Sequence, residues 1–86
     1  MKAVFSKLAD EEYRYWQKKD RRAREKIDDL LKDIAQHPFT GLGKPEPLRY
    51  DLAGCWSRRI TKAHRLVYKV EPDKIIVVSC RFHYDR

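Results

Sequence analysis

The first half of the chain predicts one short strand followed by two amphipathic helices. Residues 2–5 form a short, mainly apolar run that predicts a strand, and Ser6 behind it is a typical helix N-cap. Asp20 is placed to cap a second helix. Apolar side chains then recur at helical spacing, which predicts one buried stripe on each helix: Ala9, Tyr13 and Trp16 on the first, and Ala23, Ile27, Leu30, Leu31 and Ile34 on the second.

The second half predicts a sheet. The pair His37-Pro38 ends the second helix, because proline disfavours helical geometry at the residue before it. The segment 38–47 holds three of the four prolines and is expected to be a stiff loop. A period of two follows and predicts strands over 48–52, 55–61, 64–70 and 75–83.

This order of elements predicts the fold class. We expect an α+β domain with an N-terminal strand, two helices, and then a mainly antiparallel twisted sheet with the helices packed on one face. A length of 86 residues favours a single domain over residues 1–86.

Alternation along the predicted strands sorts their side chains onto two faces. Leu66, Tyr68 and Val70 share one side of their strand, and parity puts Ile76, Val78, Cys80 and Phe82 together on one side of the last strand. Those apolar sides should cover the helices. The opposite face is predicted to collect Arg49, Arg59, Arg65, Arg81 and His83. Like charges on neighbouring strands repel, so this face favours an anion as its partner over an incidental basic surface.

Composition supports a polyanionic partner. Lys and Arg number 20 against 13 Asp and Glu, a net charge of +7, which predicts attraction to nucleic acid, an acidic protein or an anionic membrane surface. The first residues lack the apolar run of a signal peptide, and no stretch approaches the ~18–20 apolar residues of a membrane span. We therefore expect a cytoplasmic protein without a membrane segment, with Cys55 and Cys80 as free thiols.

The basic face carries candidate chemistry for cleaving RNA without a metal. That reaction needs a base for the 2′-hydroxyl proton, an acid for the leaving oxygen, and cations for the charge on the phosphate. His83 suits acid–base work, and Arg59 and Arg65 suit the phosphate. Glu46, held between two prolines, is the candidate base. Taken singly, each could be a solvated surface residue, and Arg65 could simply pair with Glu46 or Asp51.

Metal and cofactor chemistry find little support. His37, His64 and His83 are scattered without an accompanying carboxylate cluster, and the glycines at 41 and 43 lack the spacing of a phosphate-binding loop. We expect neither a metal nor a cofactor.

Four blocks of sequence, in combination and in order, resemble a known family. Residues 43–48 (GKPEPL), 56–60 (WSRRI), 64–68 (HRLVY) and 80–84 (CRFHY) are similar to the YoeB (Txe) toxins of the RelE/ParE superfamily. The resemblance extends over nearly the whole chain.

The resemblance implies a toxin of a type II toxin–antitoxin system, a metal-independent endoribonuclease that cleaves mRNA on translating ribosomes and leaves a 2′,3′-cyclic phosphate. It implies catalytic roles for Glu46 as general base, His83 as general acid and Arg65 as stabiliser of the transition state. With the basic face, it gives a substrate-binding set of Arg49, Arg59, Arg81 and Tyr84. Arg49 stands where the family often has lysine, and Asp85-Arg86 follow its usual His-Tyr ending.

The resemblance also implies partners. These are the ribosome with mRNA in its A site and an acidic, YefM-like antitoxin whose disordered segment would wrap the basic face. Some members of the family form homodimers. Two other functions compete: a non-catalytic inhibitor of DNA gyrase, as in the ParE branch, and a plain RNA- or ribosome-binding module.

Overall fold

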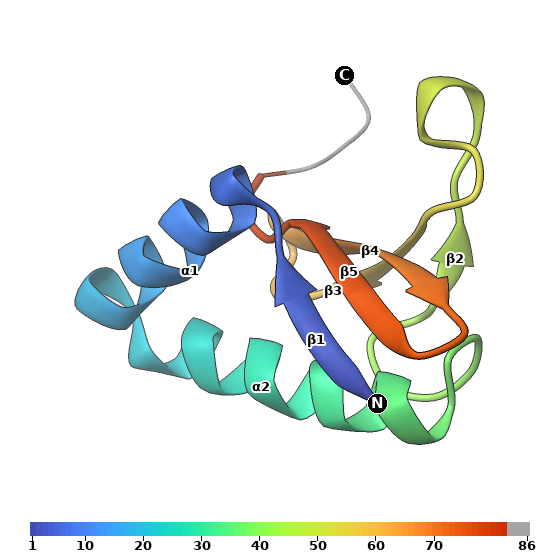
Figure 1. The fold of residues 1–86 in the computed structure, drawn as a ribbon. Coiled ribbons are helices and arrows are strands. Elements are labelled where there is room, and N and C mark those ends of the chain that lie inside the picture. Colours follow the sequence, from blue (N-terminus) through green and yellow to red (C-terminus); the bar gives the residue numbers. More distant parts are fainter. Residues whose placement is uncertain (83–86) are drawn as a thin grey trace.

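Two helices cover one face of a five-stranded sheet (Figure 1). The structure, a computed structural model, describes residues 1–82. Its elements are β1 (Lys2–Phe5), α1 (Lys7–Lys19), α2 (Arg21–Gln36), β2 (Glu46–Pro47), the single-turn 3-10 helix η1 (Tyr50–Leu52), β3 (Trp56–Arg59), β4 (Arg65–Glu71) and β5 (Lys74–Ser79). The strand order is β1-β5-β4-β3-β2, with β1 parallel to β5 and the other neighbours antiparallel. The predicted α+β fold class is confirmed.

Side-chain caps start both helices where the sequence predicts them. The Ser6 hydroxyl accepts a hydrogen bond from the Ala9 N–H at 3.0 Å. The Asp20 carboxylate accepts from the N–H groups of Arg22 and Ala23 at 3.0 and 3.2 Å. Each cap satisfies amide groups that have no partner within the helix, so these residues fix where each helix begins.

The apolar stripes of the helices meet the sheet in one core. Trp16 is buried there, and its indole N–H donates to the Cys80 carbonyl at 2.7 Å. Trp56 packs against the core from β3, with the Phe39 ring 4.8 Å away. The buried members of the core are Ala9, Trp16, Ala23, Ile27, Leu30, Ile34, Ile60, Leu66, Tyr68, Ile75, Val77 and Cys80.

The face assignment of the last predicted strand was wrong for three residues, Ile76, Val78 and Phe82, and Phe82 is exposed. Ile75 and Val77 lie in the core, whereas alternation placed Ile76 and Val78 on that side. Cys80 does lie in the core, as expected. Val77 and Cys80 both lie in the core although they are three positions apart, which a strict period of two does not allow.

A β-bulge explains this change of parity. Tyr68 pairs with Val77, but the preceding residue of β4, Val67, pairs with Ser79, so β5 advances two residues while β4 advances one. A bulge of this kind shifts every later side chain to the other face. Ser79 therefore lies opposite Val67 on the face away from the helices.

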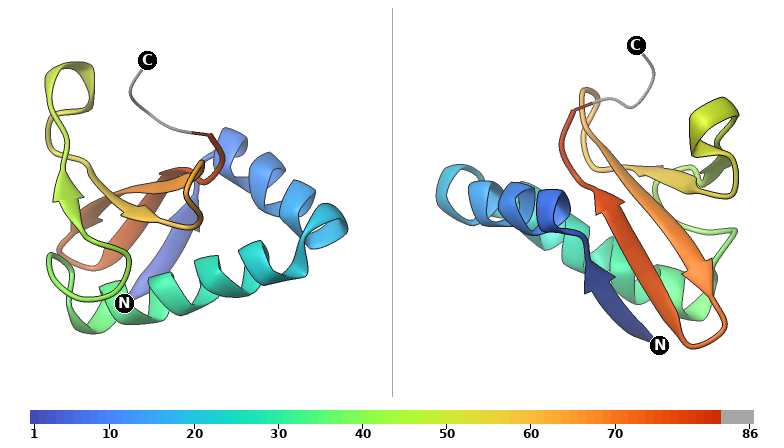
Figure 2. Two further views of the ribbon diagram at one scale, coloured as in Figure 1. Left: turned by 180° about the vertical axis from the view of Figure 1, so that it is seen from behind. Right: turned by 45° about the horizontal axis from the view of Figure 1, so that its top comes forward.

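The strand predicted over 48–52 was also wrong. The chain forms η1 there, held by hydrogen bonds from Leu52 N–H to the Arg49 carbonyl and from Ala53 N–H to the Tyr50 carbonyl. Tyr50 has φ 58°, in the left-handed region, and its side chain is 89% exposed. The segment projects from the β2 edge of the sheet (Figure 2). Only Glu46–Pro47 pair with β3.

Candidate active site on the open face of the sheet

The face of the sheet that turns away from the helices, here called the open face, carries Glu46, Ser57, Arg59, Arg65 and Val67. Glu46 pairs with Ser57, and Ser57 pairs with Val67. One step along β3, Arg59 pairs with Arg65 of β4. Directly paired residues of antiparallel strands project to the same side, and so do residues two apart on one strand. The register therefore puts Glu46, Arg59 and Arg65 on one face.

Sheet spacing puts Arg59 within side-chain reach of both Arg65 and Glu46. Directly opposed residues have Cβ atoms about 4.5–5.5 Å apart, which describes Arg59 and Arg65. A diagonal neighbour lies about 7–8 Å away, which describes Glu46 and Arg59. Glutamate and arginine side chains are long enough to span such gaps. A single phosphate could contact the carboxylate-bearing and the cationic side chains together.

Two guanidinium groups directly opposite each other are unfavourable for folding. Like charges in a cross-strand pair are destabilising unless a counter-charge lies between them. Arg59 is exposed and Arg65 is half-buried. The Arg65 Nη1 donates to the carbonyls of Thr61, Lys62 and His64 at 3.0, 3.2 and 3.3 Å. These bonds hold the Arg65 guanidinium beside the β3–β4 connection.

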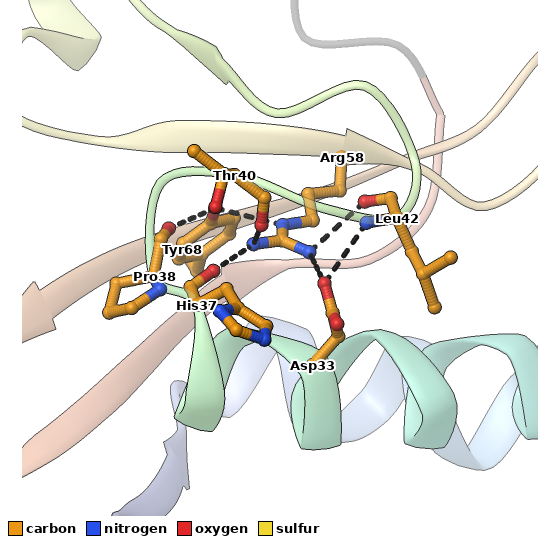
Figure 3. A network of polar contacts seen from close by, with 7 residues as sticks. All are labelled: Asp33, His37, Pro38, Thr40, Leu42, Arg58 and Tyr68. Atoms are coloured by element: carbon orange, nitrogen blue, oxygen red, sulfur yellow. Dashed lines mark hydrogen bonds and ion pairs between the residues drawn. The ribbon is translucent and has the colours of Figure 1, made fainter.

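A buried arginine anchors the loop that carries Glu46 (Figure 3). Arg58 is fully buried, and its guanidinium forms an ion pair with Asp33 near the end of α2. Its nitrogens also donate to backbone carbonyls of the loop that leads to β2; these acceptors are His37, Thr40 and Leu42. The loop is thereby fastened to both α2 and β3.

The Arg58 cluster is closed by two further contacts. The Arg58 Nε donates to the Tyr68 hydroxyl at 3.1 Å, and that hydroxyl donates to the Pro38 carbonyl at 2.9 Å. The hydrogen bond from Arg58, followed by one from the Leu42 N–H, holds the pKa of Asp33 below its ordinary value. Asp33 therefore stays ionised at neutral pH and keeps the buried guanidinium neutralised.

Arg58 is the residue that sequence reasoning missed. In the sequence, Arg58 is notable only as part of the 56–60 block, and no separate role was predicted for it. Strand alternation gives a signal that could have found it, because Arg58 shares its parity with Trp56, which faces the core. An arginine at a core-facing position needs partners, and Asp33 on α2 is one.

Gly43 brings the same loop against β3. Its carbonyl accepts from the Arg59 N–H at 2.7 Å, just beyond the β2–β3 pairing. Its φ is 79°, and a Cβ there would lie 2.9 Å from the Leu30 side chain and 3.2 Å from the Arg59 nitrogen. Glycine is therefore required for this close approach. The contact sets the loop three residues before Glu46.

Two other predicted phosphate ligands lie apart from this group. Arg49 is exposed at the start of η1, on the projecting segment. The Arg81 guanidinium stacks on the Tyr15 ring of α1, with its carbon 3.5 Å from the ring centroid, and lies 4.4 Å from the Phe82 ring centroid. The open-face placement expected for Arg81 was therefore wrong, because β5 ends at Ser79 and strand alternation no longer applies at Arg81. Phosphate binding by Arg49 and by Arg81 stays a prediction.

His83 and Tyr84 lie outside the described residues. The chain up to that point is fixed beside Arg65, because the Arg65 N–H donates to the Phe82 carbonyl at 3.1 Å. Phe82 directly precedes His83 in the sequence. The last described residue thus lies next to the paired arginines.

The part of the chain described here contains no group of three or more His, Cys, Asp or Glu residues arranged to hold a metal ion. Over residues 1–82, no helix is both long and apolar enough to cross a bilayer. Cys55 and Cys80 are free thiols. Burial raises the pKa of Cys80 to about 12, so its thiol is not a nucleophile at neutral pH.

Comparisons with known proteins point to one family. Residues 5–84 match the model of the YoeB-like toxins of bacterial type II toxin–antitoxin systems. Toxin YoeB of Escherichia coli K12 is 50% identical over 84 residues, which is 98% of this chain and all of that protein. A YoeB/ParE toxin from Agrobacterium tumefaciens superposes with a TM-score of 0.94 at 50% identity, over 98% of this chain and 100% of that chain.

Structures of a Staphylococcus aureus relative show two assemblies. A YoeB dimer superposes with a TM-score of 0.93 at 44% identity, over 98% of each chain. A YoeB–YefM complex superposes with a TM-score of 0.91 at 42% identity, over 98% of each chain.

Proposed function

Because the chain belongs to the YoeB toxin family, and is therefore the toxin of a type II toxin–antitoxin system, we propose that it is a metal-independent endoribonuclease that cleaves mRNA on translating ribosomes. The observation that carries this proposal is the cross-strand pair Arg59–Arg65 with Glu46 diagonal to it on the open face. A carboxylate beside two paired guanidinium groups is suited to a phosphodiester whose neighbouring hydroxyl must lose a proton.

In the proposed reaction, Glu46 takes the proton from the 2′-hydroxyl of the nucleotide before the cut. The 2′-oxygen attacks phosphorus, and Arg65 with Arg59 stabilises the extra negative charge on the phosphoryl oxygens. His83 gives a proton to the departing 5′-oxygen. The products are a 2′,3′-cyclic phosphate on one fragment and a 5′-hydroxyl on the other. Tyr84 orients or stacks on the substrate, and Arg49 and Arg81 contact its backbone.

The proposal includes the partners. The related S. aureus toxin forms a complex with YefM, so we propose an acidic antitoxin of that kind for this chain. The net charge of +7 favours association with an acidic chain. The dimer of the S. aureus relative motivates a homodimer here as a further proposed state.

The test is a cleavage assay on a defined mRNA in EDTA, with and without programmed ribosomes. We expect wild type to cut only with ribosomes and to leave cyclic-phosphate ends, and both Glu46→Ala and His83→Ala to lose at least about 100-fold in rate. Glu25→Gln on α2 is the matched control and should cut like wild type.

The same assay separates the competing functions. Tight ribosome binding without strand scission would replace the nuclease with a binding module. Inhibition of DNA supercoiling by gyrase with intact mRNA would replace it with a ParE-type inhibitor.

A further inference from the structure

Both backbone polar groups of Phe82 are held by two consecutive residues, His64 just before β4 and Arg65 at its first position. The Phe82 N–H donates to the Nδ1 of His64 at 2.7 Å, and the Phe82 carbonyl accepts from the Arg65 N–H at 3.1 Å. Phe82 has φ 65°, a left-handed backbone conformation that a bulky non-glycine residue rarely adopts. Such a conformation persists only where its surroundings impose it.

The His64 ring is locked in place for this contact. It packs edge-on against the Trp16 ring, with centroids 4.8 Å apart and planes at 81°. It also lies 5.7 Å from the Phe82 ring centroid. Trp16 is buried in the core and bonded to the Cys80 carbonyl, two residues before Phe82. The imidazole is therefore a rigid acceptor at the end of the described chain.

The contact requires a neutral imidazole. Nδ1 can accept a hydrogen bond only when it carries no proton, so the proton must be on Nε2. Burial, followed by the positive charge of Arg81, lowers the pKa of His64 below 6.5. Arg81 on the C-terminal segment is the charged group that acts on this ring. The Arg65 guanidinium donates to the His64 backbone carbonyl at 3.3 Å, and the Glu12 carboxylate on α1 lies near Arg81 and accepts from the Cys80 N–H at 2.7 Å. Burial and the positive charge of Arg81 oppose protonation of His64.

We propose that His64 is a positioning residue: its neutral ring holds Phe82, the residue directly before His83 in the sequence, in the left-handed conformation beside Arg65, and thereby supports the proposed role of His83. The inference rests on the proposed nuclease function and deepens it, since it assigns a role to a residue that makes no contact with substrate. Protonation of His64 removes the acceptor, so the enzyme should lose the arrangement at acidic pH.

Two variants separate the hydrogen bond from simple packing. His64→Phe keeps an aromatic ring against Trp16 but has no acceptor. His64→Asn places an amide oxygen near the position of Nδ1. The first readout needs no substrate: hydrogen exchange of the Phe82 amide, followed by NMR. We expect exchange to be faster by about 3- to 10-fold in His64→Phe, as one hydrogen bond would give, and to be partly restored in His64→Asn.

The second readout is cleavage on programmed ribosomes. We expect His64→Phe to lower kcat with little change in KM, because the role proposed for His83 is in the chemical step and not in ribosome binding. In wild type, the Phe82 amide should lose the same protection from hydrogen exchange when the pH is lowered far enough to protonate His64. The NMR signals of the His64 ring nitrogens report that protonation. This wild-type titration keeps the proposal testable if a variant fails to fold.

The results of these two measurements separate the hydrogen bond, the positioning role and the nuclease function. If the Phe82 amide stays protected in His64→Phe and at acidic pH, the His64 ring does not hold Phe82 and the proposal is wrong. If protection is lost but kcat is unchanged, the positioning role is wrong. If wild type cleaves nothing while protection of the Phe82 amide still depends on His64, the proposed nuclease function is wrong, but the hydrogen bond from Phe82 to His64 is supported.

Discussion

Two consecutive arginines of β3 point to opposite sides of the sheet and have different tasks. Arg58 is fully buried and neutralised by Asp33, and it holds the loop before β2 through three backbone carbonyls. Arg59 is exposed on the open face and paired with Arg65. The same side chain is structural at one position and available to a substrate at the next, because alternation decides which face it reaches.

This difference predicts unequal effects on stability. Arg58→Ala leaves the Asp33 carboxylate and several loop carbonyls without their donor, so we expect a loss of about 3–5 kcal/mol in the free energy of unfolding. Arg59→Ala is the matched control and should change it by no more than about 0.5 kcal/mol. Urea denaturation measures both. Equal effects would mean that Arg58 is not the anchor of the loop.

The lowered pKa of His64 makes stability depend on pH. The unfolded chain titrates near 6.5 and the folded chain below it, so the unfolded state binds more protons between these two values. Stability from this group is therefore complete above pH 6.5 and is lost as pH falls through the folded pKa. Unfolding free energies between pH 5 and 8 should show this slope in wild type and a smaller one in His64→Phe. A slope of the opposite sign would contradict the neutral imidazole.

At the level of elements, the sequence was informative wherever one local interaction decides the outcome. Ser6 and Asp20 were identified as caps, and the stripe on α2 as core, because capping and helical periodicity depend on neighbouring residues alone. The β-bulge at Val78 depends on how β5 pairs with β4. The turn at Tyr50 depends on one residue in the left-handed conformation. A strict alternation contains neither kind of information, so the parity of β5 and the strand at 48–52 were wrong.

The candidate site divides in the same way. Glu46, Arg59 and Arg65 come together because the β2–β3–β4 register has no bulge between them, so alternation holds there. Arg81 lies beyond the end of β5 at Ser79, where alternation no longer decides which side a residue reaches, so its predicted face was wrong. Arg58 was missed because a buried arginine is recognised only from its partners on α2 and the loop.

The loop before β2 should tolerate no side chain where it touches β3. Gly43→Ala combines a left-handed backbone with a Cβ 3.2 Å from the Arg59 nitrogen, so we expect a loss of roughly 2–4 kcal/mol in stability and reduced cleavage as Glu46 shifts. Gly54→Ala is the control, because it also has a left-handed φ, 95°, but nothing within 4 Å of the new Cβ. It should cost about 1–2 kcal/mol and leave cleavage intact. Thermal unfolding and the cleavage rate separate the two. Equal losses would show that the close approach is unimportant.

On the scale of the whole molecule, the fold separates its two tasks between two faces. The helices and the buried side of the sheet supply the main core, so the open face, where Ser57 and Val67 are buried, can carry paired cations at Arg59 and Arg65. The net charge of +7 adds a general attraction to polyanions, and the register of β2, β3 and β4 supplies the local arrangement.

Binding to RNA should therefore depend on salt. We expect the affinity for a single-stranded RNA to fall linearly with salt on a logarithmic scale, with a slope of about −0.7 for each phosphate contacted. Arg59→Gln should reduce that slope by roughly one contact, whereas Arg21→Gln on α2 should leave it unchanged. Fluorescence anisotropy of a labelled RNA measures this. A slope unaffected by Arg59→Gln would remove Arg59 from the phosphate site.

In the proposed reaction, Glu46 and Arg65 act on one phosphate across the open face. A double-mutant cycle on the single-turnover cleavage rate tests it, using Glu46→Gln, Arg65→Gln and the two combined, on programmed ribosomes in EDTA. Groups that act as one unit are strongly non-additive, so we predict that each single change lowers the rate nearly as far as both together. Losses that multiply, or a Glu46→Gln variant as fast as wild type, would show that Glu46 and Arg65 do not act together on one phosphate.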